Sequence, residues 1–382
     1  MTRKMSDYIK ERISRWICAS LLLSLMIVLP PAVTATPPAS ADEAKRSEAV
    51  KYAGVLPGVA LTFPRDHGAH PAFRTEWWYA TGHLKTASGK ALGFQLTFFR
   101  NRTGIGESSA SKFSPSQILF AHAAIADPAL GRLRHDERTA RAGFGVRASS
   151  DALNVALEGW TLRMDGAQMR ATIPARDFTL DLTMTSSRPP LLQDDGGYSR
   201  KGPLPNQASH YVSLTQLAVA GSTVIDGKRE AVTGIAWFDH EWSSEYLSAD
   251  AAGWDWLGAN FDDGGALMAF RMRSKNGGVV WAGGTRVLAD GTSRALGKDE
   301  VSFTPLRTWR SPRTGANWPV AMAVGAGAET FELKPWMDDQ ELDSARSTGT
   351  IYWEGAVDVM KDAKRVGRGY LELTGYAKVL RF

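Results

Sequence analysis

The chain has 382 residues, of which 22% are charged and 43% are apolar, as is typical of a soluble globular protein with two domains or one large β architecture. The formal net charge is +5, and the first 41 residues contribute +3 of it, so the remainder is close to neutral. Lysine and arginine form no stripe along the chain. We therefore expect no nucleic-acid partner.

The first 41 residues are typical of an export signal. A basic region ends at Arg15, and the apolar stretch 16–29 after it is too short to span a bilayer comfortably. Small residues form two candidate cleavage sites, Val33-Thr-Ala35 and Ala39-Ser-Ala41, and we favour the second. We therefore expect an exported, periplasmic protein without a stable membrane span. An uncleaved membrane anchor is the alternative. Cys18 is the only cysteine and lies in this segment, so the mature protein would contain no thiol.

The rest of the chain predicts an all-β protein, because glycine and aromatic residues are frequent and amphipathic helical patterns are scarce. Residues 42–61 are interpreted as a tail. The expected strands occupy residues 76–84, 92–100, 117–126, 153–162, 169–173, 178–184, 210–219, 232–242, 253–261, 266–273, 349–359 and 369–378. A polar loop at 186–206 is long enough to form a lid or a rim. Residues 337–345 are expected to form a short helix.

Two hairpins repeat one pattern about half the mature length apart. In the first hairpin, a turn at Ser88-Gly89 would place Trp77 opposite Arg100. By the same reasoning, Trp256 would lie opposite Arg271 in the second, where a cation–π contact fits. The likeness of the hairpins indicates an internal duplication and therefore two similar β-barrels.

The densest chemistry lies in Thr233-Gly-Ile-Ala-Trp-Phe-Asp-His-Glu-Trp-Ser-Ser244 and in the run that begins at Gly253-Trp-Asp-Trp256. These runs combine acids, a histidine and four tryptophans. Ionisable groups among such rings are expected to have perturbed pKa values. Two interpretations stay open, namely a barrel core with satisfied polar groups and a cavity for an apolar, polyene-like ligand.

Five motifs are specific enough to indicate a family. They are Phe63-Pro-Arg-Asp-His-Gly-Ala-His-Pro-Ala-Phe-Arg-Thr-Glu-Trp-Trp-Tyr79, Gln95-Leu-Thr-Phe-Phe-Arg100, Phe120-Ala-His-Ala-Ala124, Ala236-Trp-Phe-Asp-His-Glu-Trp-Ser-Ser244 and Gly369-Tyr-Leu-Glu-Leu-Thr-Gly-Tyr376. Together they resemble the AttH family, which is related to carotenoid 1,2-hydratase (CrtC-like proteins). The resemblance implies two tandem lipocalin-like (calycin-type) antiparallel β-barrels, which we place at residues 62–245 and 246–382.

The resemblance also implies a range of activities. Relatives add water to a terminal carotenoid double bond, and more distant ones template cyclisations of polyenes. Many AttH-type proteins have no assigned reaction and are often encoded beside export-type transporter permeases. The family therefore suggests the handling of hydrophobic molecules in the cell envelope.

Alkene hydration needs an acid that protonates carbon and aromatic faces that stabilise the resulting cation. In a strand, Asp239 and Glu241 face one way and His240 and Trp242 the other. We expect His240 and Trp242 to face the ligand and the two acids to pair on the opposite side. The resemblance to the hydratases implies a catalytic acid in the strand after the His/Trp motif. The comparable stretch here, Leu267-Met-Ala-Phe-Arg-Met-Arg273, contains no carboxylate. Asp255 could supply the acid only if it faces the same lumen.

The candidate catalytic residues are therefore His240, Asp239 and Asp255. The candidate ligand-binding residues are Trp77, Tyr79, Arg100, His122, Tyr211, Trp242, Trp254, Trp256 and Arg271. His122 can equally be a core histidine. Glu76 could serve as an acid or pair with Arg100, and we expect the pairing. His67 and His70 have loose metal-ligand spacing, but nothing fixes a third or fourth ligand, so we expect neither a metal nor another cofactor.

Three functions remain as hypotheses. The first is an exported carrier of a lipid, isoprenoid or polyene, with an ABC-type transporter permease as the expected partner. The second is a hydro-lyase or cyclase that acts on a polyene. The third is a transporter accessory subunit with filled barrels and an apolar docking surface. An enzyme needs an acid in a dry cavity, whereas a carrier needs only the cavity.

Overall fold

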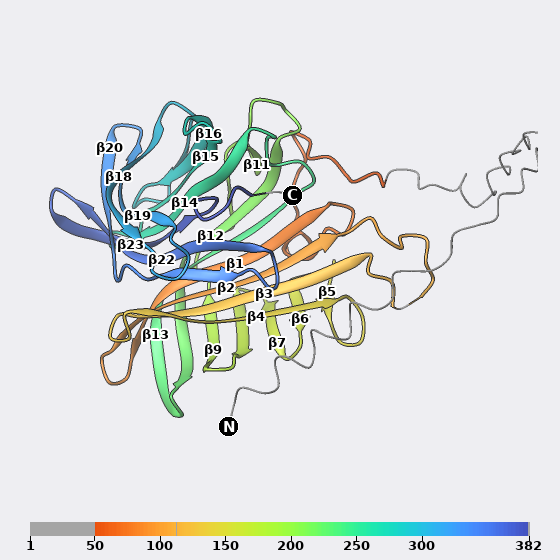
Figure 1. Cartoon of the computed structure of the whole chain (residues 1–382), viewed down its shortest axis with the longest axis horizontal. Coiled ribbons are helices and arrows are strands. Elements are labelled where there is room, and N and C mark those ends of the chain that lie inside the picture. The colour runs from red at the N-terminus through yellow and green to blue at the C-terminus, as the bar shows by residue number, and fades with distance from the viewer. Residues whose placement is uncertain (1–49, 112, 381–382) are drawn as a thin grey trace, which may run out of the picture. The chain divides into compact units, whose positions relative to one another are not determined.

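Figure 1 shows the computed structural model, which describes residues 50–111 and 113–380. These residues belong to one compact unit. The predicted signal, Cys18 and the first part of the predicted tail lie outside the described residues. In the described part of the tail, Val55 is buried against Tyr198 and Ala208. No helix among the described residues is long and apolar enough to cross a membrane.

The described chain is almost entirely β, and its strands form two antiparallel sheets (Figure 1). Among residues 50–111 and 113–380, the only helical element is a short 3-10 helix, η1 (Arg65–His67). The first sheet contains β1 (Thr75–Thr86), β2 (Ala91–Arg102), β3 (Gln117–Asp127), β4 (Arg132–Arg141), β5 (Arg147–Ala148), β6 (Asn154–Leu157), β7 (Trp160–Asp165), β8 (Gln168–Pro174), β9 (Phe178–Thr185), β10 (Leu191–Leu192), β11 (Tyr198–Arg200), β12 (Ala208–Ile225) and β13 (Lys228–Ser243).

The second sheet follows in the chain. It contains β14 (Ala251–Phe261), β15 (Ala266–Ser274), β16 (Val279–Val287), β17 (Ser293–Leu296), β18 (Val301–Arg310), β19 (Asn317–Ala326), β20 (Glu329–Pro335), β21 (Glu341–Ser344), β22 (Thr350–Lys361) and β23 (Lys364–Leu373). The short helix expected at 337–345 is wrong. This segment contains β21, which pairs with β22, and its Leu342 is buried.

Both sheets have the same connectivity. Each begins with a four-strand meander, β1 to β4 or β14 to β17, and in each the last strand returns to pair with the first. β13 therefore lies beside β1, and β23 lies beside β14. This repetition agrees with the predicted internal duplication and with two lipocalin-like barrels in tandem.

The hairpin registers differ by one residue from those predicted. Arg100 lies opposite Glu76, and Trp77 lies opposite Phe99. In the second hairpin, Arg271 lies opposite Asp255 instead of Trp256. The shift pairs each arginine with an acid across the strands, and charge pairing of this kind stabilises one register over its neighbours.

Each sheet curls around its own core. The first core contains Trp78, Phe94, Trp160 and Phe238, and the second contains Trp318 and Trp353, all fully buried. Buried side chains therefore fill the middle of both barrels. Because side chains alternate along a strand, the residues next to Trp78 point to the opposite face of β1. A third cluster on that face joins the two sheets and includes Tyr79, Tyr211, Trp237, Trp256, Phe270 and Tyr370.

Candidate functional site

A cavity of about 780 Å³ lies between the two sheets, outside both barrel cores. The first sheet lines it with the side chains of β1, β2 and β3 that point away from the first core, and with Tyr211 of β12. The second sheet lines it with Trp254 and Trp256 of β14 and with residues of β15, β22 and β23. The space that a ligand could occupy is therefore formed by the duplication and not by either barrel alone.

Aromatic side chains form much of the cavity wall. They are Trp77, Tyr79, Phe99, Phe120, Tyr211, Tyr246, Trp254, Trp256, Phe270 and Tyr352. Tyr79 meets Trp256 edge to face, with the ring centroids 5.3 Å apart. The ammonium of buried Lys201 lies 4.6 Å from the centre of the Tyr211 ring and 4.2 Å from that of Phe270. Flat, polarisable walls of this kind suit an apolar or unsaturated ligand.

Asp239 is the most heavily hydrogen-bonded acid of the cavity wall. Its Oδ1 accepts hydrogen bonds from the indole of Trp237 at 2.7 Å and the hydroxyl of Ser213 at 2.5 Å, and its Oδ2 accepts one from the Tyr211 hydroxyl at 2.7 Å. Burial raises the pKa of Asp239 to about 7, although these donors oppose the shift. Asp239 can therefore exist as a neutral acid or as a carboxylate near neutral pH.

Three further carboxyl groups belong to the same region: Glu241 and Glu354 are buried, and Glu372 is half-buried. Burial raises the pKa of Glu372 to about 7, against a hydrogen bond from the Trp254 side chain. Burial and the neighbouring Glu372 raise the pKa of Glu354, which accepts a hydrogen bond from the Tyr79 hydroxyl. Glu241 forms an ion pair with Lys201 at 3.1 Å. Acids with raised pKa values in a cavity are typical of functional sites.

The comparisons with known proteins agree with this architecture. The family model of AttH-like proteins matches residues 54–376. The chain belongs to the AttH-like family. It is 50% identical to an AttH protein from Nitrosomonas europaea of known crystal structure, with a TM-score of 0.80, and the match covers 85% of this chain and 99% of that chain.

A more distant structure shares the fold of this AttH-like protein. Kievitone hydratase from Nectria haematococca is 15% identical with a TM-score of 0.66, over 87% of this chain and 97% of that chain. At this identity the likeness concerns the fold alone. The chain matches none of the curated proteins. The resemblance inferred from the motifs is thus confirmed at the level of the family.

The structure of this AttH-like protein brings most of the predicted ligand-binding residues to the cavity. Those on its wall are Trp77, Tyr79, His122, Tyr211, Trp254 and Trp256. Arg100, Trp242 and Arg271 are not part of the wall. Both ring nitrogens of His122 are engaged, Nδ1 with the Tyr352 hydroxyl at 2.7 Å and Nε2 with the Ser347 hydroxyl at 2.8 Å. Whether these residues bind a ligand stays a prediction.

The expected faces of β13 are reversed. Asp239 and Glu241 line the cavity, whereas His240 and Trp242 lie on the opposite face of β13, the face on which His240 contacts Trp78. The alternation of side chains along β13 was predicted correctly. However, the cavity lies between the sheets, so it meets the face of β13 that points away from the first core. Within the first sheet, His240 stacks on Trp78 at a centroid distance of 4.9 Å.

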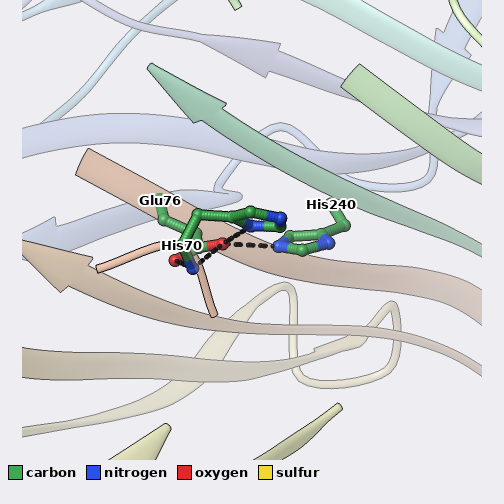
Figure 2. Close-up of side chains that lie close together, drawn as sticks. All are labelled: His70, Glu76 and His240. Atoms are coloured by element: carbon green, nitrogen blue, oxygen red, sulfur yellow. Dashed lines mark hydrogen bonds and ion pairs between the residues drawn. The ribbon is translucent and has the colours of Figure 1, made fainter. Parts of the chain in front are cut away.

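His240 forms a second polar cluster with His70 and Glu76 (Figure 2), and none of the three lines the cavity. Nε2 of His240 lies 2.9 Å from Oε1 of Glu76, and Nδ1 of His70 lies 2.7 Å from the same oxygen. Burial would raise the pKa of Glu76, but the two histidines and Arg100 hold it well below its usual range. Glu76 pairs with Arg100 at 2.8 Å, as predicted.

Asp255 occupies the corresponding place in the second sheet. It is fully buried and forms ion pairs with Arg271 at 2.6 Å and Arg273 at 3.1 Å. It also accepts a hydrogen bond from the Tyr376 hydroxyl at 3.0 Å. Asp255 is not on the cavity wall, so the structure does not bring it together with Asp239 in one lumen.

Sequence reasoning missed the cavity acid Glu372, and it missed Glu354, which accepts a hydrogen bond from Tyr79 of the cavity wall. Glu372 lies opposite Trp256, just as Glu241 lies opposite Trp77 in the first sheet. The signal was present in the sequence as a glutamate within the apolar run Gly369-Tyr-Leu-Glu-Leu373. A single charged residue within an otherwise apolar strand indicates a polar site on the face of the sheet to which that residue points.

Proposed function

We propose that this protein binds a largely apolar small molecule, such as a lipid, isoprenoid or polyene, in the cavity between its two sheets. The observation that supports this best is the aromatic wall around a volume of about 780 Å³, which is within the range of small-molecule sites. Burying about 300 Å² of apolar ligand surface would contribute about 7 kcal/mol before ordering costs. That is sufficient for carriage without any reaction.

The experiment is mass spectrometry of organic extracts of the purified protein. A co-purified hydrophobic molecule at near one equivalent per chain is expected. Phe99→Asp should abolish it, because Phe99 lines the cavity and stacks on Phe120 at 4.8 Å. Phe113→Asp is the matched control, since Phe113 is 65% exposed and lies outside the cavity. Equal ligand content in both variants would contradict the proposal.

A second function, acid-catalysed hydration of an alkene, is favoured by one observation. Asp239 has a pKa of about 7 on an aromatic cavity wall, which a plain carrier does not need. Its neutral acid would transfer a proton to one alkene carbon and leave a carbocation on the other. Water would attack that carbon and return a proton to the carboxylate, so the acid is regenerated and one water is consumed. The fold shared with kievitone hydratase is compatible with this chemistry.

Incubation with an acyclic carotenoid in D₂O containing H₂¹⁸O tests the second function. The expected product carries one carbon-bound deuterium and one ¹⁸O hydroxyl. Asp239→Asn should abolish its formation while ligand binding persists, because asparagine keeps the shape of the neutral acid but has no acidic proton. Asp226→Asn, which changes an acid outside the cavity, should retain turnover. Binding without turnover in the wild-type protein would leave carriage as the function.

A further inference from the structure

Three potential ligand atoms converge in the first sheet, from segments far apart in the chain. His70 lies between η1 and β1, Glu76 lies in β1, and His240 lies in β13. Figure 2 shows both imidazole rings directed at the Glu76 carboxylate. One ring nitrogen of each histidine and one carboxylate oxygen all lie within 4.8 Å of one another, with Glu76 and His240 buried and His70 partly exposed.

The outer atom of each group is held by a second partner. Nε2 of His70 lies 3.3 Å from Oδ1 of Asp66, and Nδ1 of His240 lies 3.1 Å from the Asp66 carbonyl oxygen. Oε2 of Glu76 accepts a hydrogen bond from Nε of Arg100 at 2.8 Å. Metal-binding histidines almost always donate their second N–H to a carboxylate or a backbone carbonyl. Both histidines here have that support.

A count of hydrogens shows that two neutral histidines cannot donate to all four of the oxygens that their ring nitrogens face. All four ring nitrogens of His70 and His240 face oxygen acceptors, but a neutral imidazole has only one N–H. If the two outer nitrogens donate to Asp66, the two inner nitrogens direct lone pairs at Oε1 of Glu76. Three lone pairs would then meet at one point. A divalent cation there would replace the two missing protons with the same charge.

Stacking fixes the orientation of both rings. The His70 ring lies 3.8 Å from that of Trp242 with an angle of 6° between the planes. The His240 ring lies 4.9 Å from that of Trp78 at 17°. The inner nitrogens are therefore preorganised, and little side-chain entropy would be lost on binding an ion.

We propose that His70, Glu76 and His240 form a binding site for a divalent transition-metal ion. Two imidazoles and one carboxylate are a ligand set that suits Zn²⁺, at distances of about 2.0–2.2 Å. Tetrahedral coordination would require the two ring nitrogens, now 2.7 and 2.9 Å from Oε1 of Glu76, to move to about 3.3 Å from it. The exposed side of His70 provides access, and the ion would tie the segment before β1 to β1 and β13. This site is independent of the function proposed for the cavity.

Metal content of the full chain, purified without a polyhistidine tag, tests the site. After incubation with Zn²⁺ and dialysis, about one equivalent per chain is expected by plasma mass spectrometry. His70→Ala should weaken Zn²⁺ binding by 100-fold or more. His122→Gln, which alters a buried histidine at the cavity, should retain the full equivalent.

Direct titration of the wild-type protein with Co²⁺ provides a readout that needs no variant. Saturable d–d absorption at one equivalent, abolished by competing Zn²⁺, is expected. Zinc retention below one tenth of an equivalent, or equal retention in wild type and a folded His70→Ala protein, would overturn the proposal. The cluster would then be a hydrogen-bonded network without a metal ion.

Discussion

The Tyr211 hydroxyl donates a hydrogen bond to Oδ2 of Asp239 and accepts one from the indole of Trp256, at 2.7 and 2.9 Å. Tyr211 and Asp239 belong to the first sheet and Trp256 to the second. The hydrogen bonds therefore connect the acid of the cavity wall to both halves of the duplication. We therefore expect the protonation of Asp239 to be coupled to the packing between the sheets.

Replacing Tyr211 with phenylalanine should show that coupling. The Tyr211→Phe protein loses a hydrogen bond that favours the carboxylate, so the pKa of Asp239 should rise further above its usual range. The Trp256 N–H would also lose its partner, at a cost of about 1–3 kcal/mol. Infrared titration of the carboxyl band and urea unfolding measure the two effects. An unchanged titration would show that Tyr211 does not influence the acid.

Asp239 and Glu372 should make the folded protein more stable on the acidic side of neutrality. Their pKa values are raised to about 7, whereas an unfolded chain has carboxyl pKa values of about 4. Between these values the folded state binds more protons than the unfolded chain, so the free energy of unfolding falls as pH rises from about 4 to 7.

Asp239→Asn removes one of these titrations. The stability advantage of the variant over wild type should be larger at pH 8 than at pH 5, as measured by urea unfolding. Glu300→Gln, at an exposed position, should follow the wild-type pH profile. A stability difference that is the same at both pH values would mean that Asp239 does not change its protonation over this range.

The Glu76–Arg100 pair should contribute strongly to stability. Both side chains are buried, with exposures of 0% and 2%. Glu76→Gln leaves Arg100 without its counter-ion, which should cost about 3–5 kcal/mol. Unfolding is measured with EDTA present, so that a lost metal does not contribute. Glu300→Gln breaks the exposed pair with Arg294 and should have little effect. Equal effects of the two substitutions would contradict this role.

Export is predicted from residues 1–41 alone. Expression of the full chain in a Gram-negative host should yield a periplasmic protein whose first residue is Asp42, because the small residues before it suit signal peptidase. Intact-mass spectrometry of the periplasmic fraction measures the terminus. A membrane-bound protein that retains the first 41 residues would support the anchor alternative.

The class of fold was predictable from the sequence because its signals are local. The alternation around Trp77 and Trp256, the two hairpins and the family motifs all lie within short segments. The one-residue error in both hairpins arose from placing the turn by its residues alone. The register is instead set by pairs such as Glu76 with Arg100 across the strands.

The location of the site was not predictable, because it depends on contacts distant in sequence. Alternation separated Asp239 from His240, but only the packing of the second sheet determines which face of β13 meets the cavity. Likewise, nothing in the sequence around His67 and His70 fixed a third or fourth metal ligand. Pairing of the first strand with the last places Glu76 beside His240.

The most direct measurement is a crystal structure of the protein soaked with the hydrophobic molecule that co-purifies with it. Binding between the sheets predicts ligand density in contact with Trp77 and Trp256, near the Asp239 carboxyl group. Density within the core around Trp160 or around Trp353, with the inter-sheet cavity left to water, would contradict the account.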